Sequence, residues 1–183
     1  IFYSKAIMIR AGVGQSQEKV TRCAVEKAAA QALSRAGISR ADFAIIFFTA
    51  DHVAQSSDWV TGLSQAVGTD CVVGSSGAGV LTGEGEIEGG PGVVVCVVAS
   101  DTLMARPFIF EPLRDNETNL GVSFGDFLAK TEEKNSLLIL LPDSYQGNPQ
   151  PLLAGMARRA GFHPVIGAGS SENGTTGATY QLC

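Results

Sequence analysis

The sequence predicts an α/β fold in layers, with a mixed and partly parallel sheet. Apolar segments of strand length alternate with helical segments through most of the chain, and this alternation is typical of helices packed on such a sheet. The apolar runs 93–100 and 103–110 are joined only by Asp101 and Thr102, which predicts an antiparallel hairpin added to the sheet. A third observation is an internal repeat of strand, helix and strand.

The first expected elements are a strand and a helix. Residues 2–10 are apolar, and we expect Gly12 and Gly14 to end this strand. Ser16 then offers its hydroxyl to the first free amides of a helix that runs to Ala36. Small residues recur on this helix at every fourth position, so one of its faces can pack closely on a sheet.

The following elements continue the same order. Residues 44–49 read as a buried strand, which polar residues follow, and a helix is expected over 57–67 because Gly68 ends the helical pattern. Residues 72–76 then form a second strand that runs into a turn rich in glycine and serine. The two strands are expected to be parallel because a helix connects them.

Residues 43–100 and 136–182 are predicted to be two copies of a β-α-β-β unit. In each unit an acidic residue follows the first strand and a glycine ends the second, at a spacing of 23 positions in one unit and 24 in the other. Each unit then continues through a Gly-rich stretch into another strand. The matched positions are Asp51 and Asp143, Gly74 and Gly167, and the strands 92–95 and 177–180. We interpret the match as an internal duplication.

Composition and charge exclude several classes of function. The chain has 183 residues, of which 45% are hydrophobic and 17% charged, which fits a compact domain. A net charge of -5 offers nucleic acid no broad positive surface, so nucleic acid is not an expected partner. No apolar run approaches the roughly 18 residues of a membrane helix, and no secretory pattern is recognised. We therefore expect a cytoplasmic protein without a membrane span.

The Gly-rich turns after the second strand of each unit are the candidate ligand site. They place hydroxyls and bare amides at the carboxyl ends of strands, where open α/β sheets bind ligands. We expect both turns to face one hollow that holds a small zwitterion, although plain chain reversal explains the same composition. The turn residues of this candidate site are Gly74, Ser75, Ser76, Gly77 and Gly79 in the first unit and Gly167, Gly169 and Ser170 in the second.

Charged residues near the turns complete the candidate site. Asp51, Glu84 or Glu86 can hold an amino group, while solvated charges at a sheet edge are the alternative for the glutamates. His52 beside Asp51 is either a base with its orienting acid or a solvent-facing loop residue. Arg106, within the expected strand 103–110, needs a carboxylate partner, which is Glu84, Asp51 or a ligand, unless it is an exposed edge residue.

The segment from Val72 to Leu81, with Gly83, Glu84 and the strand that follows, resembles the Gly-Cys-Ser-Thr-Ala-Gly turn of FIST amino-terminal domains. The resemblance extends over most of residues 1–183. It implies an intracellular sensory module that binds small ligands such as amino acids and whose partners are a carboxyl-terminal FIST domain, not contained in these residues, or a signalling protein. Ser75 and Gly77 differ from the usual residues, so the shape of the turn carries over rather than any thiol chemistry.

Enzymatic function is not expected. Ser76 and Ser171 each miss the Gly-x-Ser-x-Gly pattern of a nucleophile elbow by one residue, and no dinucleotide, phosphate-loop or metal-binding spacing occurs, so no cofactor is expected. Two alternatives to the ligand sensor stay open. One is an acyl-transfer or amide-hydrolysing enzyme that uses Ser76 or Cys71, and the other is a pure protein-interaction module.

Overall fold

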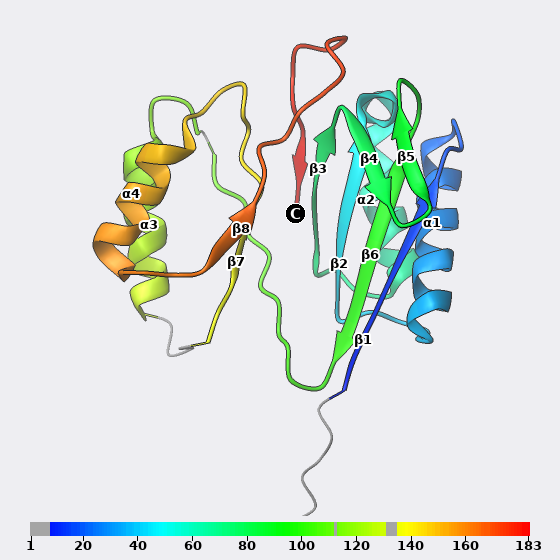
Figure 1. Cartoon of the computed structure of the whole chain (residues 1–183), viewed down its shortest axis with the longest axis horizontal. Helices are drawn as coiled ribbons and strands as arrows, with labels where there is room; N and C mark the ends of the chain where they lie inside the picture. The colour runs from blue at the N-terminus through cyan, green and yellow to red at the C-terminus, as the bar shows by residue number, and fades with distance from the viewer. Residues whose placement is uncertain (1–7, 112, 131–134) are drawn as a thin grey trace, which may run out of the picture.

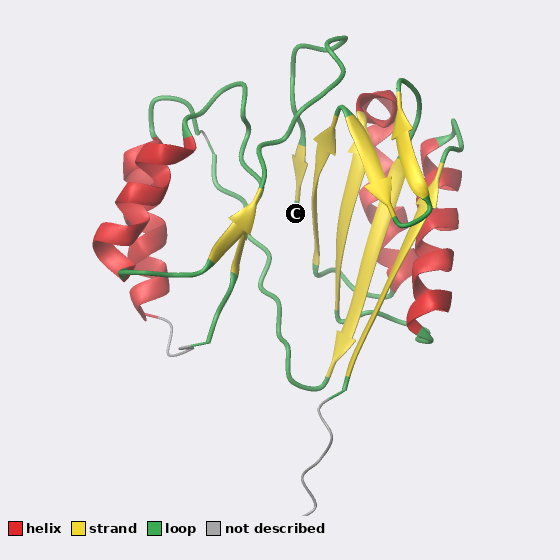
Figure 2. Ribbon diagram, viewed as in Figure 1, coloured by secondary structure: helices red, strands yellow, loops and turns green. Residues whose placement is uncertain are grey.

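The computed structural model describes residues 8–111, 113–130 and 135–183, without the side chains of residues 54–59. The chain folds into two α/β lobes with their helices on the outside (Figures 1 and 2). The strands are β1 (Ile9–Ser16), β2 (Phe43–Thr49), β3 (Val72–Gly77), β4 (Gly79–Thr82), β5 (Gly85–Glu88), β6 (Val93–Ser100), β7 (Leu138–Leu140), β8 (Val165–Gly167) and β9 (Gln181–Leu182). The helices are α1 (Thr21–Ala36), the 3-10 helix η1 (Ala50–Gln55), α2 (Ser56–Val67), α3 (Glu117–Lys130) and α4 (Pro149–Ala160).

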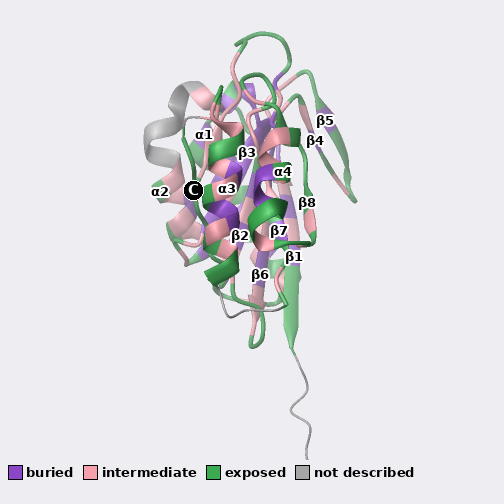
Figure 3. Ribbon diagram, turned by 90° about the vertical axis from the view of Figure 1, so that its left-hand side faces the viewer, coloured by how far each residue is buried: buried purple, intermediate pink, exposed green. Residues whose placement is uncertain are grey.

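The first lobe is built on a five-stranded sheet in the order β1-β6-β2-β3-β9. Strands β2 and β3 are parallel, and every other neighbouring pair in this sheet is antiparallel. The predicted α/β class with a mixed sheet is therefore confirmed. Helices α1 and α2 cover one face, and Figure 3 shows the buried residues concentrated along the central strands. On β2 the buried side chains of this face are Ala44, Ile46 and Phe48.

Helix α1 packs against β1 through small residues, as predicted, but the boundary between the two elements is different. Strand β1 runs through Gly12 and Gly14 to Ser16, and α1 begins only at Thr21. The glycines do not break the strand. A Cβ at Gly12 would lie 2.1 Å from the carbonyl oxygen of Ala32, so glycine is what allows the helix to approach. The expected strand residues 2–7 lie outside the described part of the chain.

The expected strand over 103–110 is wrong. Residues 102–111, the crossing segment, leave the first lobe after β6 and reach the second lobe without strand pairing. Strand β6 is central in the sheet, and β1 and β2 already occupy both of its edges. The crossing segment instead packs on α3, where the rings of Phe108 and Phe124 have centroids 4.7 Å apart.

The second lobe repeats the helix-covered arrangement on a smaller scale. Strands β7 and β8 are parallel, and α3 and α4 cover one of their faces around Phe124, Leu138 and Met156. The register sets Gly167 opposite Leu140, just as Gly74 lies opposite Ile46 in the first lobe.

The end of the second predicted unit is placed differently from its counterpart. The expected strand over 177–180 is wrong, because strand β9 begins only at Gln181. It pairs antiparallel with β3 of the first lobe and not with β7 or β8. Both units contain two parallel strands joined by a helix, and their common origin remains a prediction.

Candidate ligand-binding site

The two Gly-rich turns meet, although they lie more than 90 residues apart in the sequence. The Ser76 hydroxyl donates to the Ser171 carbonyl oxygen at 2.8 Å, and the Ser171 amide donates to the Ser76 carbonyl oxygen at 3.1 Å. The Ala78 amide donates to the Ser171 hydroxyl at 3.0 Å. These three hydrogen bonds, named here the turn junction, join the carboxyl end of β3 to the chain that follows β8.

The serine hydroxyls of the turns are bonded within the protein. Besides donating to Ser171, the Ser76 hydroxyl accepts from the Tyr180 amide at 3.0 Å. The Ser170 hydroxyl accepts from the Gln181 side-chain amide at 2.9 Å. Ser75, Ser76 and Ser170 all have exposed fractions of 3% or less. The convergence of the turns therefore produces a joint between the lobes, and its hydroxyls face protein groups.

The predicted glycines lie where the backbone is crowded or turns. A Cβ at Gly74 would lie 2.2 Å from the Ile46 carbonyl oxygen, and one at Gly167 would lie 1.9 Å from the Leu140 carbonyl oxygen. Gly77 ends β3. The remaining two predicted glycines are Gly79, which pairs with Glu88 at the start of β4, and Gly169, which lies against Ser144.

Asp51 and His52 follow β2 as expected, but His52 does not face solvent. Its exposed fraction is 0%, and its Nδ1 lies 3.0 Å from the hydroxyl of Thr21 at the start of α1. Its Nε2 is buried without a hydrogen-bond partner in the described structure. Asp51 is exposed and accepts a hydrogen bond from the Thr49 hydroxyl at 3.1 Å. The interpretation of His52 as a solvent-facing loop residue is therefore wrong.

The burial of His52 predicts a specific loss of stability in acid. Desolvation lowers the pKa of His52, and the nearby Asp51 carboxylate opposes this only in part. Because the unfolded chain then takes up the proton first, the stabilisation is complete above about pH 6.5 and is lost as pH falls through the folded pKa. We expect urea unfolding to show a larger loss between pH 7.5 and 5 in the wild type than in His52→Gln. Equal losses would contradict the assignment.

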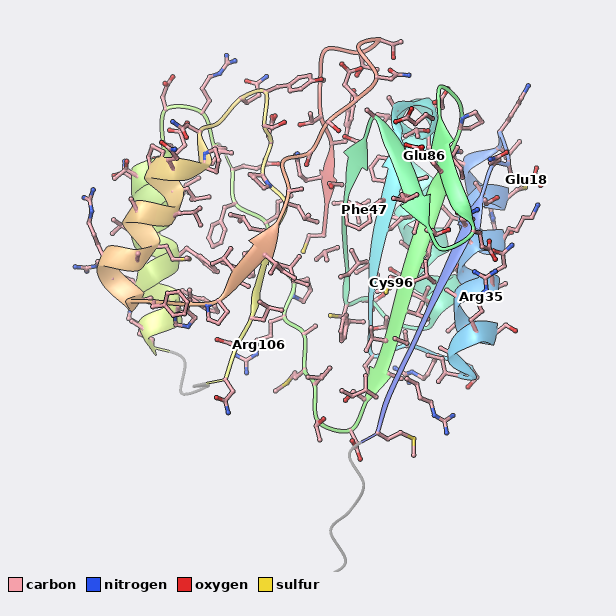
Figure 4. All side chains as sticks on the ribbon, in the orientation of Figure 1. Glu18, Arg35, Phe47, Glu86, Cys96 and Arg106 are labelled. Carbon is pink, nitrogen blue, oxygen red and sulfur yellow. The ribbon has the colours of Figure 1, made fainter. Side chains whose placement is uncertain are left out.

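The structure does not bring Glu84 and Arg106 together. Glu84, in the turn between β4 and β5, forms an ion pair with Arg35 of α1. Arg106 lies on the crossing segment, on the other side of the main sheet, as Figure 4 shows from the labels of Arg35, Glu86 and Arg106. Glu86 is exposed, and its hydrogen bond with Glu88 raises its pKa. The suggested pairing of Glu84 with Arg106 is therefore wrong.

A large cavity lies between the two lobes. Its volume is about 1020 Å³, and it is bounded by the face of the main sheet opposite α1 and α2, by the crossing segment and by β7 with α3 and α4. The side chains of Phe43, Ile45 and Val73 form the wall on the first lobe, and those of Leu137 and Ile139 form part of the opposite wall. The hairpin β4-β5 covers a different part of the sheet, where Val80 and Ile87 pack on Val94.

Sequence reasoning missed this interlobe cavity. Among the predicted site residues, only Gly74 and Arg106 belong to its described lining. Asp143 also lines the cavity, but from the sequence it was identified only as the counterpart of Asp51 in the internal repeat. A signal was present in residues 43–48, which are apolar at every position. A strand that is apolar on both faces must be covered on both faces. Helices α1 and α2 cover only one face of the main sheet, so the other face needs a second covering layer.

The polar groups of the cavity come from the chain between β6 and α3, from residues 135–146 and from residues 163 and 181. Asp143 accepts hydrogen bonds from the amides of Tyr145 at 2.9 Å and Gln146 at 3.1 Å, so its carboxylate is held in a fixed orientation. In the described part of the chain, no group of three or more His, Cys, Asp or Glu side chains is arranged to hold a metal ion. The polar residues that line the cavity are Thr102, Arg106, Glu111, Arg114, Asn135, Ser136, Asp143, Gln146, His163 and Gln181.

A comparison with models of protein families shows to which family the chain belongs. The family model of the FIST N domain matches residues 42–183, which is most of the chain and includes both turns and the cavity. The chain belongs to the FIST N family. FIST domains are described as small-ligand sensory domains of signalling proteins. The resemblance of the first turn to this family is thereby confirmed. A search of curated proteins finds no match to this FIST domain. Within the described residues, none of its helices has the length and apolar character needed to cross a membrane.

Proposed function

We propose that this FIST domain is an intracellular sensor that binds a small, amino-acid-like ligand in the interlobe cavity and relays its occupancy to a signalling partner. The observation that carries the proposal is that both lobes line the cavity. A ligand there contacts the main sheet and β7 at once, so its binding energy depends on how the lobes are placed. Occupancy then shifts the balance between arrangements of the lobes according to the difference in affinity.

The properties of the cavity support binding there rather than at the turns. Small-molecule sites are typically about 300–1,000 Å³ in volume, mainly apolar, and equipped with a few polar groups, and the interlobe cavity of about 1020 Å³ has this character. The hydroxyls of Ser76 and Ser170 already have partners. A ligand at the turns would have to replace these bonds, whereas a ligand in the cavity would not.

The contacts of Ser76 and Cys71 weigh against the hydrolase alternative. The Ser76 hydroxyl donates to a backbone carbonyl and accepts from a backbone amide, so no imidazole receives its proton. The Cys71 thiol is half-buried, with its sulfur 3.7 Å from the Ala105 carbonyl oxygen. Burial, with a smaller effect of Cys183, raises the pKa of Cys71, which disfavours the reactive thiolate.

Thermal unfolding with a panel of amino acids tests the proposal. At about 100 times its dissociation constant a ligand adds roughly 2.7 kcal/mol, which raises the melting temperature of a domain of this size by about 5 to 11 °C. We expect this shift for amino acids with large apolar side chains. Ile139→Trp should reduce it because the larger ring occupies the cavity.

Leu81→Trp is the matched control. Leu81 is an exposed apolar residue of β4 outside the cavity lining, so the same enlargement there should leave the shift unchanged. Equal effects of the two tryptophan variants, or no shift by any amino acid at saturating concentration, would contradict ligand binding in the cavity.

A further inference from the structure

Two buried polar atoms without partners lie at the amino ends of β7 and β8. They are the hydroxyl oxygen of Ser136 and Nδ1 of His163, and the described part of the chain contains only one other such atom, Nε2 of His52. Both residues line the interlobe cavity. Leu138 of β7 pairs with Val165 of β8 in a parallel register. Ser136 lies two residues before Leu138 and His163 lies two residues before Val165, so the two residues occupy matching positions.

Unpartnered buried polar atoms are rare in native structures because each loses its bonds to water without replacement. Two of them at matching positions beside one cavity indicate a group that is bound when the site is filled. Ser136 can donate through its hydroxyl, and His163 can donate through Nδ1 in the tautomer that carries hydrogen there. A ligand atom that accepts hydrogen bonds from both is the simplest partner.

Arg106 adds positive charge to the same cavity. It lies on the crossing segment, and in Figure 4 its side chain extends toward the amino end of β7. The carboxylate of Asp143 lies at the opposite end of β7, seven positions beyond Ser136, which is roughly 20 Å along an extended chain. The cavity therefore combines the hydrogen-bond donors of Ser136 and His163 with the cation of Arg106, and this combination suits an anion.

We propose that the carboxylate of the ligand binds in the cavity to Ser136, His163 and Arg106, with its apolar body against the apolar residues that line the same cavity. The ligand class is a small monocarboxylic acid with an aromatic or aliphatic body. This inference rests on the proposed function of the cavity and specifies which group is recognised. An ammonium group next to the carboxylate would approach Arg106, so it adds no affinity.

Calorimetric titration of the chain with matched probes tests the inference. The probes are 3-phenylpropionate, 3-phenylpropanamide and 2-phenylethylamine, which share one apolar body and differ in the polar group. We expect 3-phenylpropionate to bind at least tenfold more tightly than the amide and no more weakly than phenylalanine. The amine should give no measurable binding. Equal affinities of acid and amide, or tighter binding of the amine or of phenylalanine, would overturn the inference.

Variants of the two orphan groups complete the experiment. Ser136→Ala and His163→Leu should each lower the affinity for 3-phenylpropionate by about tenfold. His163→Asn keeps a hydrogen-bond donor near the position of Nδ1 and should retain most of the affinity. Gln146→Leu changes a polar residue elsewhere on the cavity lining and serves as the control. Equal weakening by Gln146→Leu and Ser136→Ala would contradict the assigned position of the carboxylate.

A measurement without ligand separates this inference from simple structural damage. Because the Ser136 hydroxyl has no partner, Ser136→Ala should unfold at the same or a higher temperature than the wild type when no ligand is present. A lower melting temperature would mean that the Ser136 hydroxyl stabilises the folded protein without ligand, and this would contradict the inference. If no probe binds the wild type, the carboxylate site is overturned, and the amino-acid panel decides separately whether the cavity binds any ligand.

Discussion

Replacing Gly167 with alanine should destabilise the chain by about 3 kcal/mol or more, the upper range for forced overpacking. The added Cβ would lie 1.9 Å from the carbonyl oxygen of Leu140, which is backbone and cannot rotate away. The φ of 147° at Gly167 is also a value that residues with a side chain rarely adopt. The two parallel strands β7 and β8 would have to separate at this point.

Gly74→Ala should have a similar effect in the first lobe. Its Cβ would lie 2.2 Å from the Ile46 carbonyl oxygen, at the corresponding place in the parallel pair β2 and β3. Chemical denaturation monitored by circular dichroism measures both losses. We expect similar losses of stability at the two sites, because at each one glycine lies against the carbonyl oxygen of the paired strand. An unchanged stability at either site would contradict the crowding described here.

Gly62→Ala is the matched control for both substitutions. Gly62 lies within α2, and a Cβ there would meet nothing within 4 Å. Alanine is favoured over glycine inside a helix, so this variant should be more stable by about 0.5 to 1 kcal/mol. A loss at Gly62 comparable to that at Gly167 would show that the method responds to any loss of glycine rather than to backbone crowding.

The layered α/β class followed from the sequence because the alternation of apolar strands and helices is a local pattern. The boundary before α1 did not, since Gly12 and Gly14 are required by contact with the Ala28 and Ala32 carbonyls, which only the packed helix supplies. The strand expected over 103–110 failed for a related reason. Apolar content indicates burial, but it does not say whether a sheet edge is available.

The candidate site was predictable in part. The repeat of turn residues pointed to two segments that touch, but they bond directly to each other instead of surrounding a hollow. Which groups the turns contact was not predictable, since the partners of Ser76 come from residues 171 and 180. The interlobe cavity depends on how two lobes are placed, and composition alone does not specify that placement.

Ser76→Ala is expected to destabilise the chain by about 1 to 3 kcal/mol, the cost of leaving buried partners unsatisfied. The substitution removes the donor to the Ser171 carbonyl oxygen and the acceptor of the Tyr180 amide. Ser75→Ala is the control, because it removes a hydroxyl at comparable burial without touching those two contacts. Urea unfolding of the two variants and the wild type gives the comparison.

The same pair of variants distinguishes a structural serine from a catalytic one. If Ser76 acts as a nucleophile, Ser76→Ala should abolish turnover of ester or amide substrates while costing little stability. If it belongs to the turn junction, the loss of stability should clearly exceed that of Ser75→Ala, and ligand binding in the interlobe cavity should weaken because the lobes are less firmly joined. Equal stability of the two variants would contradict this role of Ser76, since its bonds to Ser171 and Tyr180 would then contribute nothing to the free energy of unfolding.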